Sequence, residues 1–389
     1  MAGCSQRTPS SPLPAERQSA TTFPLRSDVA FAQQPDAGFK SVYNFAGGRD
    51  ASNPFGVLLL ANGTFYSNTL NGGKNGVGTV YKVSTSGKES VLYSFAGPPA
   101  DGRYPIAGLA AKNGEFYGTT GYGGTDDLGT VFKVSASGVE HVLHTFTGPD
   151  GENPQSGLVL VNGAFYSTTQ YGGADGIGAV FKVSTSGAES VIYSFNIYAN
   201  PPDGRQPVGD LILVSGTLYG TTLGGGSGGV GTVFKVSTSG TEHVLYNFKG
   251  SPDGSTPYAG LINLNGTLYG ATQYGGASGN GTVFKVSTAG AEHVIYSFKG
   301  TPDGATPYAR LVALNGTLYG TTYDGGASGN GIIFKVSTSG VEKVLYSFTG
   351  LPYGGSHPIA GMTAVSGALY GTTSEGGKNL TGMVYKLTP

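Results

Sequence analysis

The chain has 389 residues, and it contains 69 glycines, 24 tyrosines and 19 phenylalanines but no tryptophan. Only 12% of the residues are charged, about half the share in an average globular protein, and the formal net charge is −1. A nearly neutral chain lacks the clustered Lys and Arg of a nucleic-acid-binding protein, and one cysteine excludes a disulfide framework. No apolar run approaches the ~18 residues that cross a bilayer. We therefore expect a glycine-rich β protein with no cofactor, no metal site, no nucleic-acid partner and no transmembrane segment.

Residues 1–38 differ from the rest of the chain. They are rich in Ser, Pro, Gln and Thr and poor in aromatic residues, which predicts a flexible tether. The opening Met1-Ala2-Gly3-Cys4 resembles the cleavage site of a bacterial lipoprotein signal peptide, in which the cysteine takes the lipid. The charged and apolar segments of such a signal do not precede it. Cys4 is a candidate lipidation site if the true start lies upstream, and otherwise an ordinary thiol.

From residue 39 onward the sequence is a tandem repeat of about 50 residues. Three aromatic anchors recur seven times each, in segments of the types LYG, VFKV and YSF. The LYG anchors are Tyr66, Tyr117, Tyr166, Tyr219, Tyr269, Tyr319 and Tyr370. The VFKV anchors are Tyr81, Phe132, Phe181, Phe234, Phe284, Phe334 and Tyr385, and the YSF anchors are Phe45, Phe95, Phe146, Phe195, Phe248, Phe298 and Phe348. This spacing indicates seven copies of one structural unit.

Each unit has the pattern of four short β-strands. In the fifth unit, four segments are rich in β-branched and aromatic residues: 259–264, 267–273, 282–287 and 292–298. Asn265-Gly266 between the first two segments is a strong hairpin signal, and a glycine-rich loop separates the second from the third. No segment has a helical period of useful length. The protein should therefore be all-β.

Four strands in about 50 residues, repeated seven times, match the blades of a seven-bladed β-propeller. The first strand, residues 41–45, resembles the fourth strand of a unit, and the last strand, 382–387, resembles the third. We predict a ring spanning residues 39–389, in which the N-terminal strand completes a seventh blade that begins near residue 359. Such closure leaves no free sheet edge. A linear β-solenoid is the alternative, although solenoid repeats are usually shorter.

Two charged patterns also repeat. Lysines such as Lys82 in the third strand and glutamates such as Glu89 at the start of the fourth predict cross-strand ion pairs; a ring of lysines for an anionic ligand is the alternative. Six units contain Asp-x-x-x-Pro, mostly with Gly after the Asp. We interpret it as a turn in which Asp caps the backbone and Gly supplies a positive φ. Calcium binding by the Asp residues is the alternative.

Departures from the repeat mark the candidate site. In the innermost strand, where small residues are the rule, the fourth unit has Asp210 and the sixth has Arg310. These two charges should line the axial channel, as a ligand-binding pair or as an ion pair that plugs it. Five positions after the LYG anchor, in the loop between the second and third strands, the repeat carries Tyr122, Tyr171, Tyr274, Asp324 and Glu375.

The longer loops should share one face of the propeller, because strand direction alternates within a blade. Tyr258, Tyr308 and Tyr323 should lie near the loop tyrosines, where their rings can stack on sugar rings. Simple packing of rings with solvated hydroxyls is the alternative. Asp324 and Glu375 fall in adjacent units, and two carboxylates beside a glycosidic bond would be the acid and base of a glycosidase.

The repeat resembles that of the GloVer-repeat proteins, a family of exported bacterial tandem-repeat proteins. The resemblance rests on LYGTT, GTVFKVS, VLYSF and the following Asp-Gly, and it covers residues 39–389. It implies export or surface attachment, and it implies no enzymatic activity, cofactor or catalytic residue.

We therefore expect an extracytoplasmic protein, secreted or held as a lipoprotein at the outer membrane or cell surface. Its expected function is to bind a glycan, a cell-surface polymer or a protein partner. The alternatives are a hydrolase or lyase acting on polysaccharide, and a purely structural surface protein.

Overall fold

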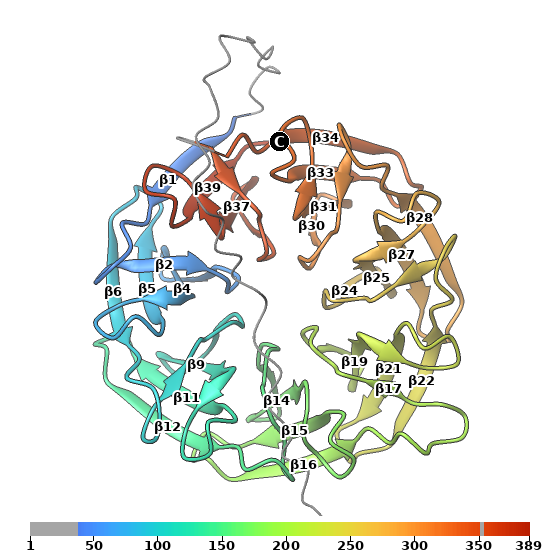
Figure 1. Cartoon of the computed structure of the whole chain (residues 1–389), viewed down its shortest axis with the longest axis horizontal. Coiled ribbons are helices and arrows are strands. Elements are labelled where there is room, and N and C mark those ends of the chain that lie inside the picture. The colour runs from blue at the N-terminus through green and yellow to red at the C-terminus, as the bar shows by residue number, and fades with distance from the viewer. Residues whose placement is uncertain (1–37, 351–353) are drawn as a thin grey trace, which may run out of the picture. The chain divides into compact units, whose positions relative to one another are not determined.

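The structure is a computed structural model, and it describes residues 38–350 and 354–389. Seven antiparallel sheets surround a central axis, which confirms the expected all-β, seven-bladed propeller (Figure 1). Across the described residues, no helix has the length and apolar character needed to cross a membrane. Cys4 and nearly all of the predicted tether, residues 1–38, lie outside the described residues.

Each blade has four strands, and their order runs from the axis outward. Blade 1 contains β3 (Leu59–Ala61), β4 (Thr64–Gly72), β5 (Thr79–Ser84) and β6 (Glu89–Ser94), and β2 (Ala51–Pro54) also pairs with β4. Blade 2 contains β8 (Ala110–Lys112), β9 (Glu115–Thr120), β11 (Thr130–Ser135) and β12 (Glu140–Thr145). Blade 3 contains β13 (Val159–Val161), β14 (Ala164–Thr169), β15 (Ala179–Val183) and β16 (Glu189–Ser194). Blade 4 contains β18 (Ile212–Val214), β19 (Thr217–Thr222), β21 (Thr232–Ser237) and β22 (Glu242–Asn247).

The remaining three blades follow the same order. Blade 5 contains β24 (Ile262–Leu264), β25 (Thr267–Thr272), β27 (Thr282–Ser287) and β28 (Glu292–Ser297). Blade 6 contains β30 (Val312–Leu314), β31 (Thr317–Thr322), β33 (Ile332–Val336) and β34 (Glu342–Ser347). Blade 7 contains β36 (Thr363–Val365), β37 (Ala368–Thr373), β39 (Met383–Leu387) and β1 (Lys40–Asn44).

Blade 7 is built from the two ends of the described chain. Strand β1 pairs antiparallel with β39, with Lys40 opposite Lys386 and Asn44 opposite Met383 (Figure 1). The Asn379 side-chain amide also donates to the Phe45 carbonyl at 2.9 Å. The N-terminal strand therefore completes the last blade, as the order of strand types predicts, and β39 is not left as a free edge.

The hydrophobic core lies between neighbouring blades. All seven phenylalanines of the YSF segments are fully buried. Each packs edge-to-face on the VFKV-type aromatic ring of the next blade; for example, the ring centroids of Phe95 and Phe132 are 5.0 Å apart, and those of Phe298 and Phe334 are also 5.0 Å apart. Because the same contact recurs at every junction, these anchors hold the ring of blades together and are not part of a site.

The predicted ion pairs between third-strand lysines and fourth-strand glutamates are wrong. Glu89 lies opposite Val83, while Lys82 lies opposite Ser90. The turn contains three residues between the paired Ser84 and Lys88, whose backbone hydrogen bond is 3.0 Å long. Because neighbouring side chains alternate between the two faces of a sheet, a register shift of one residue separates the charges.

The fourth-strand glutamates lie between blades. Glu89 sits beside Tyr43 and Asp50, which come from the junction between blades 7 and 1, and its Oε1 atom is buried without a hydrogen bond. Burial, followed by the charge of Asp50, raises the pKa of Glu89 to about 7. The same residue types meet at the following junctions, where burial raises the pKa of Glu140 and Glu292 to about 7 and that of Glu242 to about 8.

The Asp-Gly turns form, although glycine has a different role from the predicted one. Asp101 accepts backbone hydrogen bonds from Gly102 at 2.6 Å and Ala96 at 2.6 Å, so Asp stabilises its own turn. Gly102 does not have a positive φ, and a Cβ there would overlap the side chain of Thr120. The left-handed residues are those before each proline: Asn53, Tyr104, Asn153, Gln206, Thr256, Thr306 and His357. Close packing therefore requires glycine after Asp at positions 102, 204, 254 and 304, whereas Gly151 has the predicted positive φ, of 138°.

The longer loops share one face, which we call the loop face. In five junctions, four Asp-Gly turns and the equivalent Gly354-Gly355 segment pair as a short strand with the loop between the second and third strands of the same blade. These pairs are β7 (Gly102–Arg103) with β10 (Tyr122–Gly123), β17 (Gly204–Arg205) with β20 (Gly224–Gly225), β23 (Gly254–Ser255) with β26 (Tyr274–Gly275), β29 (Gly304–Ala305) with β32 (Asp324–Gly325), and β35 (Gly355–Ser356) with β38 (Glu375–Gly376). The opposite face, which we call the turn face, carries the tight hairpin turns.

Candidate functional site

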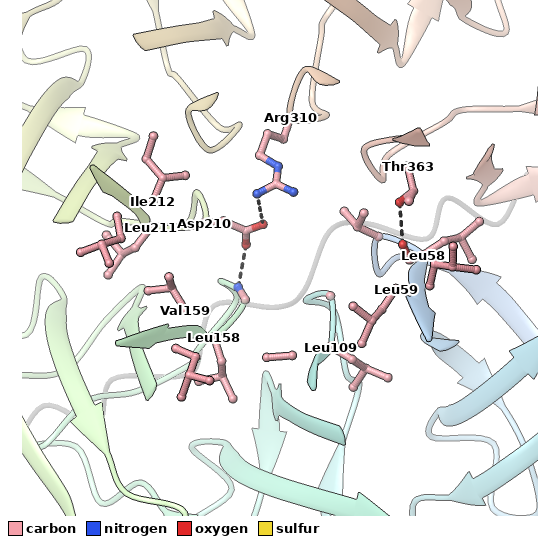
Figure 2. Close-up of a pocket in the computed structure, with 17 residues that line it drawn as sticks. Leu58, Leu59, Leu109, Leu158, Val159, Asp210, Leu211, Ile212, Arg310 and Thr363 are labelled. Atoms are coloured by element: carbon pink, nitrogen blue, oxygen red, sulfur yellow. Dashed lines mark hydrogen bonds and ion pairs between the residues drawn. The ribbon is translucent and has the colours of Figure 1, made fainter. Parts of the chain in front are cut away.

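Two cavities occupy the axis of the propeller. The larger, of about 650 Å³, is lined by the innermost strands towards the turn face, and the smaller, of about 80 Å³, lies towards the loop face. Val57, Gly108, Asp210 and Arg310 line both cavities, so the two meet at the level of the predicted charged pair. Figure 2 shows the larger cavity with this pair at its edge.

The two predicted axial charges face each other across the channel. Arg310 Nη1 and Asp210 Oδ2 are 3.9 Å apart, and the Asp210 Oδ1 atom accepts a hydrogen bond of 2.6 Å from the backbone of Gly157 (Figure 2). Glycine at 157 and 260 makes room for Asp210, because a Cβ at either position would press on that residue. Asp210 thus contacts blades 3 and 6 from blade 4, and both roles considered for the pair, ligand binding and plugging of the channel, stay predictions.

The larger cavity has apolar walls that were not predicted from the sequence. Leu60, Leu160 and Leu213 line it and are 36%, 39% and 40% exposed. The sequence did contain a signal for these walls. The position three residues after the axial residue is leucine in units 1, 3 and 4, but it is small or polar in the other units. The signal was hidden because leucine in a strand is usually core.

An arc of aromatic side chains lies on the loop face of blades 5 to 7. Ring centroids are 5.0 Å apart for Tyr258 and Tyr308, 5.2 Å for Tyr308 and Tyr323, and 4.4 Å for Tyr323 and His357. His357 Nδ1 also forms a hydrogen bond of 3.2 Å with Glu375. We use the name aromatic arc for the four rings of this group together with Glu375. His357 was not predicted, since its position before a proline has no consistent residue type across the units.

The aromatic arc combines apolar rings with polar groups. The Tyr258 hydroxyl donates to Gln155 Oε1 at 3.0 Å. Burial is the main cause that raises the pKa of Tyr258 and Tyr308 to about 12, so both hydroxyls remain protonated at neutral pH. The charge of Asp324 contributes at Tyr308, which places that predicted site residue beside the arc. Tyr274, which also contributes to the raised pKa of Tyr308, is 48% exposed.

The other two predicted tyrosines, Tyr122 and Tyr171, lie on blades 2 and 3. The Arg103 guanidinium lies over the rings of Tyr104 and Tyr122, at 5.1 and 5.4 Å from their centroids. Arg103 also donates to Asp127 at 2.9 Å, which fixes the guanidinium in place. Tyr171 forms a β-bridge with Glu152. The structure therefore groups Tyr308, Tyr323, Asp324 and Glu375. Tyr171 lies near both Tyr258 and Tyr122, since it contributes electrostatically to the raised pKa of each.

The acid–base chemistry of the arc differs from that of a glycosidase acid. The hydrogen bond with His357 lowers the pKa of the Glu375 carboxyl. Glu375 is therefore ionised at neutral pH, and an ionised carboxylate is an acceptor for the hydroxyl groups of a ligand. A group of side chains of metal-ligating types, His144, Asp150 and Glu189, lies elsewhere, at the outer edge between blades 2 and 3.

The comparisons with known proteins agree with the fold. The sequence matches the model of a family described as the Gloeobacter/Verrucomicrobia repeat over residues 26–200 and again over 196–385. A comparison with curated protein sequences finds no significant match.

Two solved structures are similar at low identity. The tricorn protease is 10% identical, with a TM-score of 0.44 over 82% of this chain and 27% of that chain. PorZ, an essential bacterial surface component of the type-IX secretion system of Porphyromonas gingivalis, is 15% identical, with a TM-score of 0.51 over 85% of this chain and 46% of that chain. This chain thus spans less than half the length of either structure, and the likeness to PorZ concerns the fold alone.

Proposed function

The chain belongs to the Gloeobacter/Verrucomicrobia repeat family, and we propose that it is an interaction module whose loop face binds a carbohydrate or a cell-surface polymer of sugars. The observation that carries this proposal is the aromatic arc, in which Tyr308 and Tyr323 lie between further rings on a face built from loops. Loops on a rigid scaffold are where binding residues concentrate.

The chemistry of the arc suits a neutral, polyhydroxylated ligand. Sugar rings present an apolar face of C–H groups and a rim of hydroxyls, and tyrosine offers a flat apolar ring with a polar end. The ionised Glu375 carboxylate supplies an acceptor for ligand hydroxyls at one end of the arc. A phosphate-bearing ligand fits less well, because no lysine or arginine belongs to the arc.

The lowered pKa of Glu375 does not suit the general acid of a glycosidase. A glycosidase needs one carboxyl that is protonated at the working pH, which requires a raised pKa. Glu375 has the opposite shift. An ionised carboxylate does suit the base or nucleophile of a glycosidase. The proposal of a binding module therefore rests on the aromatic arc, and hydrolysis is kept as an outcome that the test can detect.

The test is a screen of soluble polysaccharides and oligosaccharides, with release of reducing sugar recorded in the same wells. We expect binding without sugar release, and Tyr308→Ala should weaken it about tenfold, which corresponds to loss of one good ring contact. Tyr198→Ala is the matched control, because Tyr198 is 81% exposed and lies far from the arc in sequence. Equal binding by both variants would remove the aromatic arc as the site. Sugar release that Glu375→Gln abolishes would show a hydrolase instead.

A further inference from the structure

One junction between blades departs from the repeat at the outer edge. The fourth strand carries a tyrosine near its end in six units, but in blade 2 the equivalent residue is His144. The equivalent tyrosines are Tyr43, Tyr93, Tyr193, Tyr246, Tyr296 and Tyr346. The His144 ring keeps the tyrosine's place, since it packs edge-to-face on Phe146 with centroids 4.9 Å apart, as Tyr93 does on Phe95 at 5.2 Å. The exchange therefore changes the chemistry of the position and not its packing.

The aspartate beside His144 is also held differently. At the tyrosine junctions, one carboxylate oxygen accepts two hydrogen bonds: Asp253 Oδ2, for example, accepts from the Tyr246 hydroxyl at 2.8 Å and from the backbone of Lys249 at 3.0 Å. Asp150 instead accepts the backbone N–H and the hydroxyl of Thr147 at its Oδ1 atom, at 2.8 and 3.0 Å. Among the described residues, its Oδ2 atom pairs only with His144 Nε2, at 2.9 Å. That oxygen keeps a free lone pair.

A second carboxylate completes the group. Glu189, at the start of the outer strand of blade 3, has a buried Oε1 atom with no hydrogen-bond partner among the described residues. One ligand atom each from His144, Asp150 and Glu189 lie within 4.8 Å of one another, and all three residues are partly exposed. An imidazole nitrogen, a carboxylate oxygen with a free lone pair and a buried, unsatisfied carboxylate oxygen thus converge at one point between blades 2 and 3.

We propose that His144, Asp150 and Glu189 bind a divalent transition-metal ion of the Zn²⁺ type. Zinc accepts one nitrogen and two carboxylate oxygens at about 2.0–2.2 Å and completes a tetrahedral site with water. Calcium fits less well, because it takes six to eight oxygen ligands. The ion would satisfy the Glu189 oxygen, offset the repulsion between the two carboxylates and link the outer strands of blades 2 and 3.

The repeat itself supplies the matched variant. His144→Tyr restores the residue of the other six units, so it should fold while losing the nitrogen ligand. His141→Ala removes an exposed histidine three residues away on the same strand and serves as the control for adventitious binding. Glu189→Gln keeps the shape of the side chain and removes its charge.

The experiment is a calorimetric titration of the metal-free protein with zinc chloride, repeated with magnesium chloride, together with thermal unfolding in zinc or EDTA. We expect one zinc ion per chain, no comparable uptake of magnesium, and a higher Tm with zinc. His144→Tyr and Glu189→Gln should weaken zinc binding at least tenfold, and His141→Ala should not. No zinc binding by the unaltered protein, or equal affinity in His144→Tyr, overturns the proposal.

Discussion

At the residue scale, the most unusual groups are the glutamates between blades. Their carboxyls lie beside an aspartate and lose solvation on folding, which raises the pKa of Glu292 to about 7 and that of Glu242 to about 8. A carboxyl with a raised pKa in the folded state binds its proton more tightly there than in the unfolded chain, where the pKa is about 4.3. The contribution of such a carboxyl to the free energy of unfolding is therefore most favourable at low pH. It declines as the pH rises towards the pKa that the carboxyl has in the folded state.

This linkage predicts a specific pH dependence. Between about pH 5 and pH 8, rising pH should lower the stability contributed by these carboxyls. Glu242→Gln removes the titrating group, so it should raise the Tm by about 1–2 °C at pH 8.5 and change it little at pH 5. Thermal unfolding followed by circular dichroism measures both.

Glu115→Gln is the control of opposite sign. Hydrogen bonds from Tyr117 and Lys133 lower the pKa of Glu115, so its charge stabilises the fold above the unfolded pKa. Its replacement should slightly lower the Tm at pH 8.5. A fall in Tm at that pH for Glu242→Gln would contradict the proposed effect of the buried carboxyls.

At the element scale, the sequence predicted the strands, turns and blade order because each depends on a local pattern that recurs seven times. The register of the third and fourth strands was not predictable, because a three-residue turn and a four-residue turn have similar sequences but opposite side-chain parity. The role of glycine after Asp was also misjudged. Composition shows that a glycine is present, but only the packed structure shows that the threonines of the neighbouring strands fill the space beside it.

That packing predicts the effect of one methyl group. At Gly254, a Cβ would overlap the side chain of Thr272, so Gly254→Ala should lower the free energy of unfolding by about 1–3 kcal/mol through overpacking. Ser255→Ala, at the next position, is the control and should change it by less than about 0.5 kcal/mol. Denaturant unfolding gives both values. If Gly254→Ala is as stable as the control, the glycine is not required by close packing.

At the scale of the whole molecule, the site depends on ring closure. The sequence predicted that Asp210 and Arg310 would share the axis, since both occupy the same position of the repeat. Their separation of 3.9 Å, the Gly157 contact and the apolar cavity beside them required the curvature of the closed ring. The aromatic arc was visible only in part, because His357 has no histidine counterpart in the other units.

Closure by β1 makes a prediction about truncation. Removal of residues 1–37 should leave the Tm unchanged, because β1 begins at Lys40. Removal of residues 1–46 also deletes β1 and Phe45, exposes the edge of β39 and should cause loss of folding or aggregation. Thermal unfolding and size-exclusion chromatography of the two forms test this. Equal stability of both forms would show that blade 7 does not need its N-terminal strand.

The sharpest test of carbohydrate binding at the loop face is a crystal structure of the protein with the oligosaccharide that binds most tightly in the screen. We expect sugar rings stacked on Tyr308 or Tyr323, with a ligand hydroxyl within hydrogen-bonding distance of Glu375. A sugar bound in the larger axial cavity, or at the turn face with the aromatic arc empty, would contradict the proposed function.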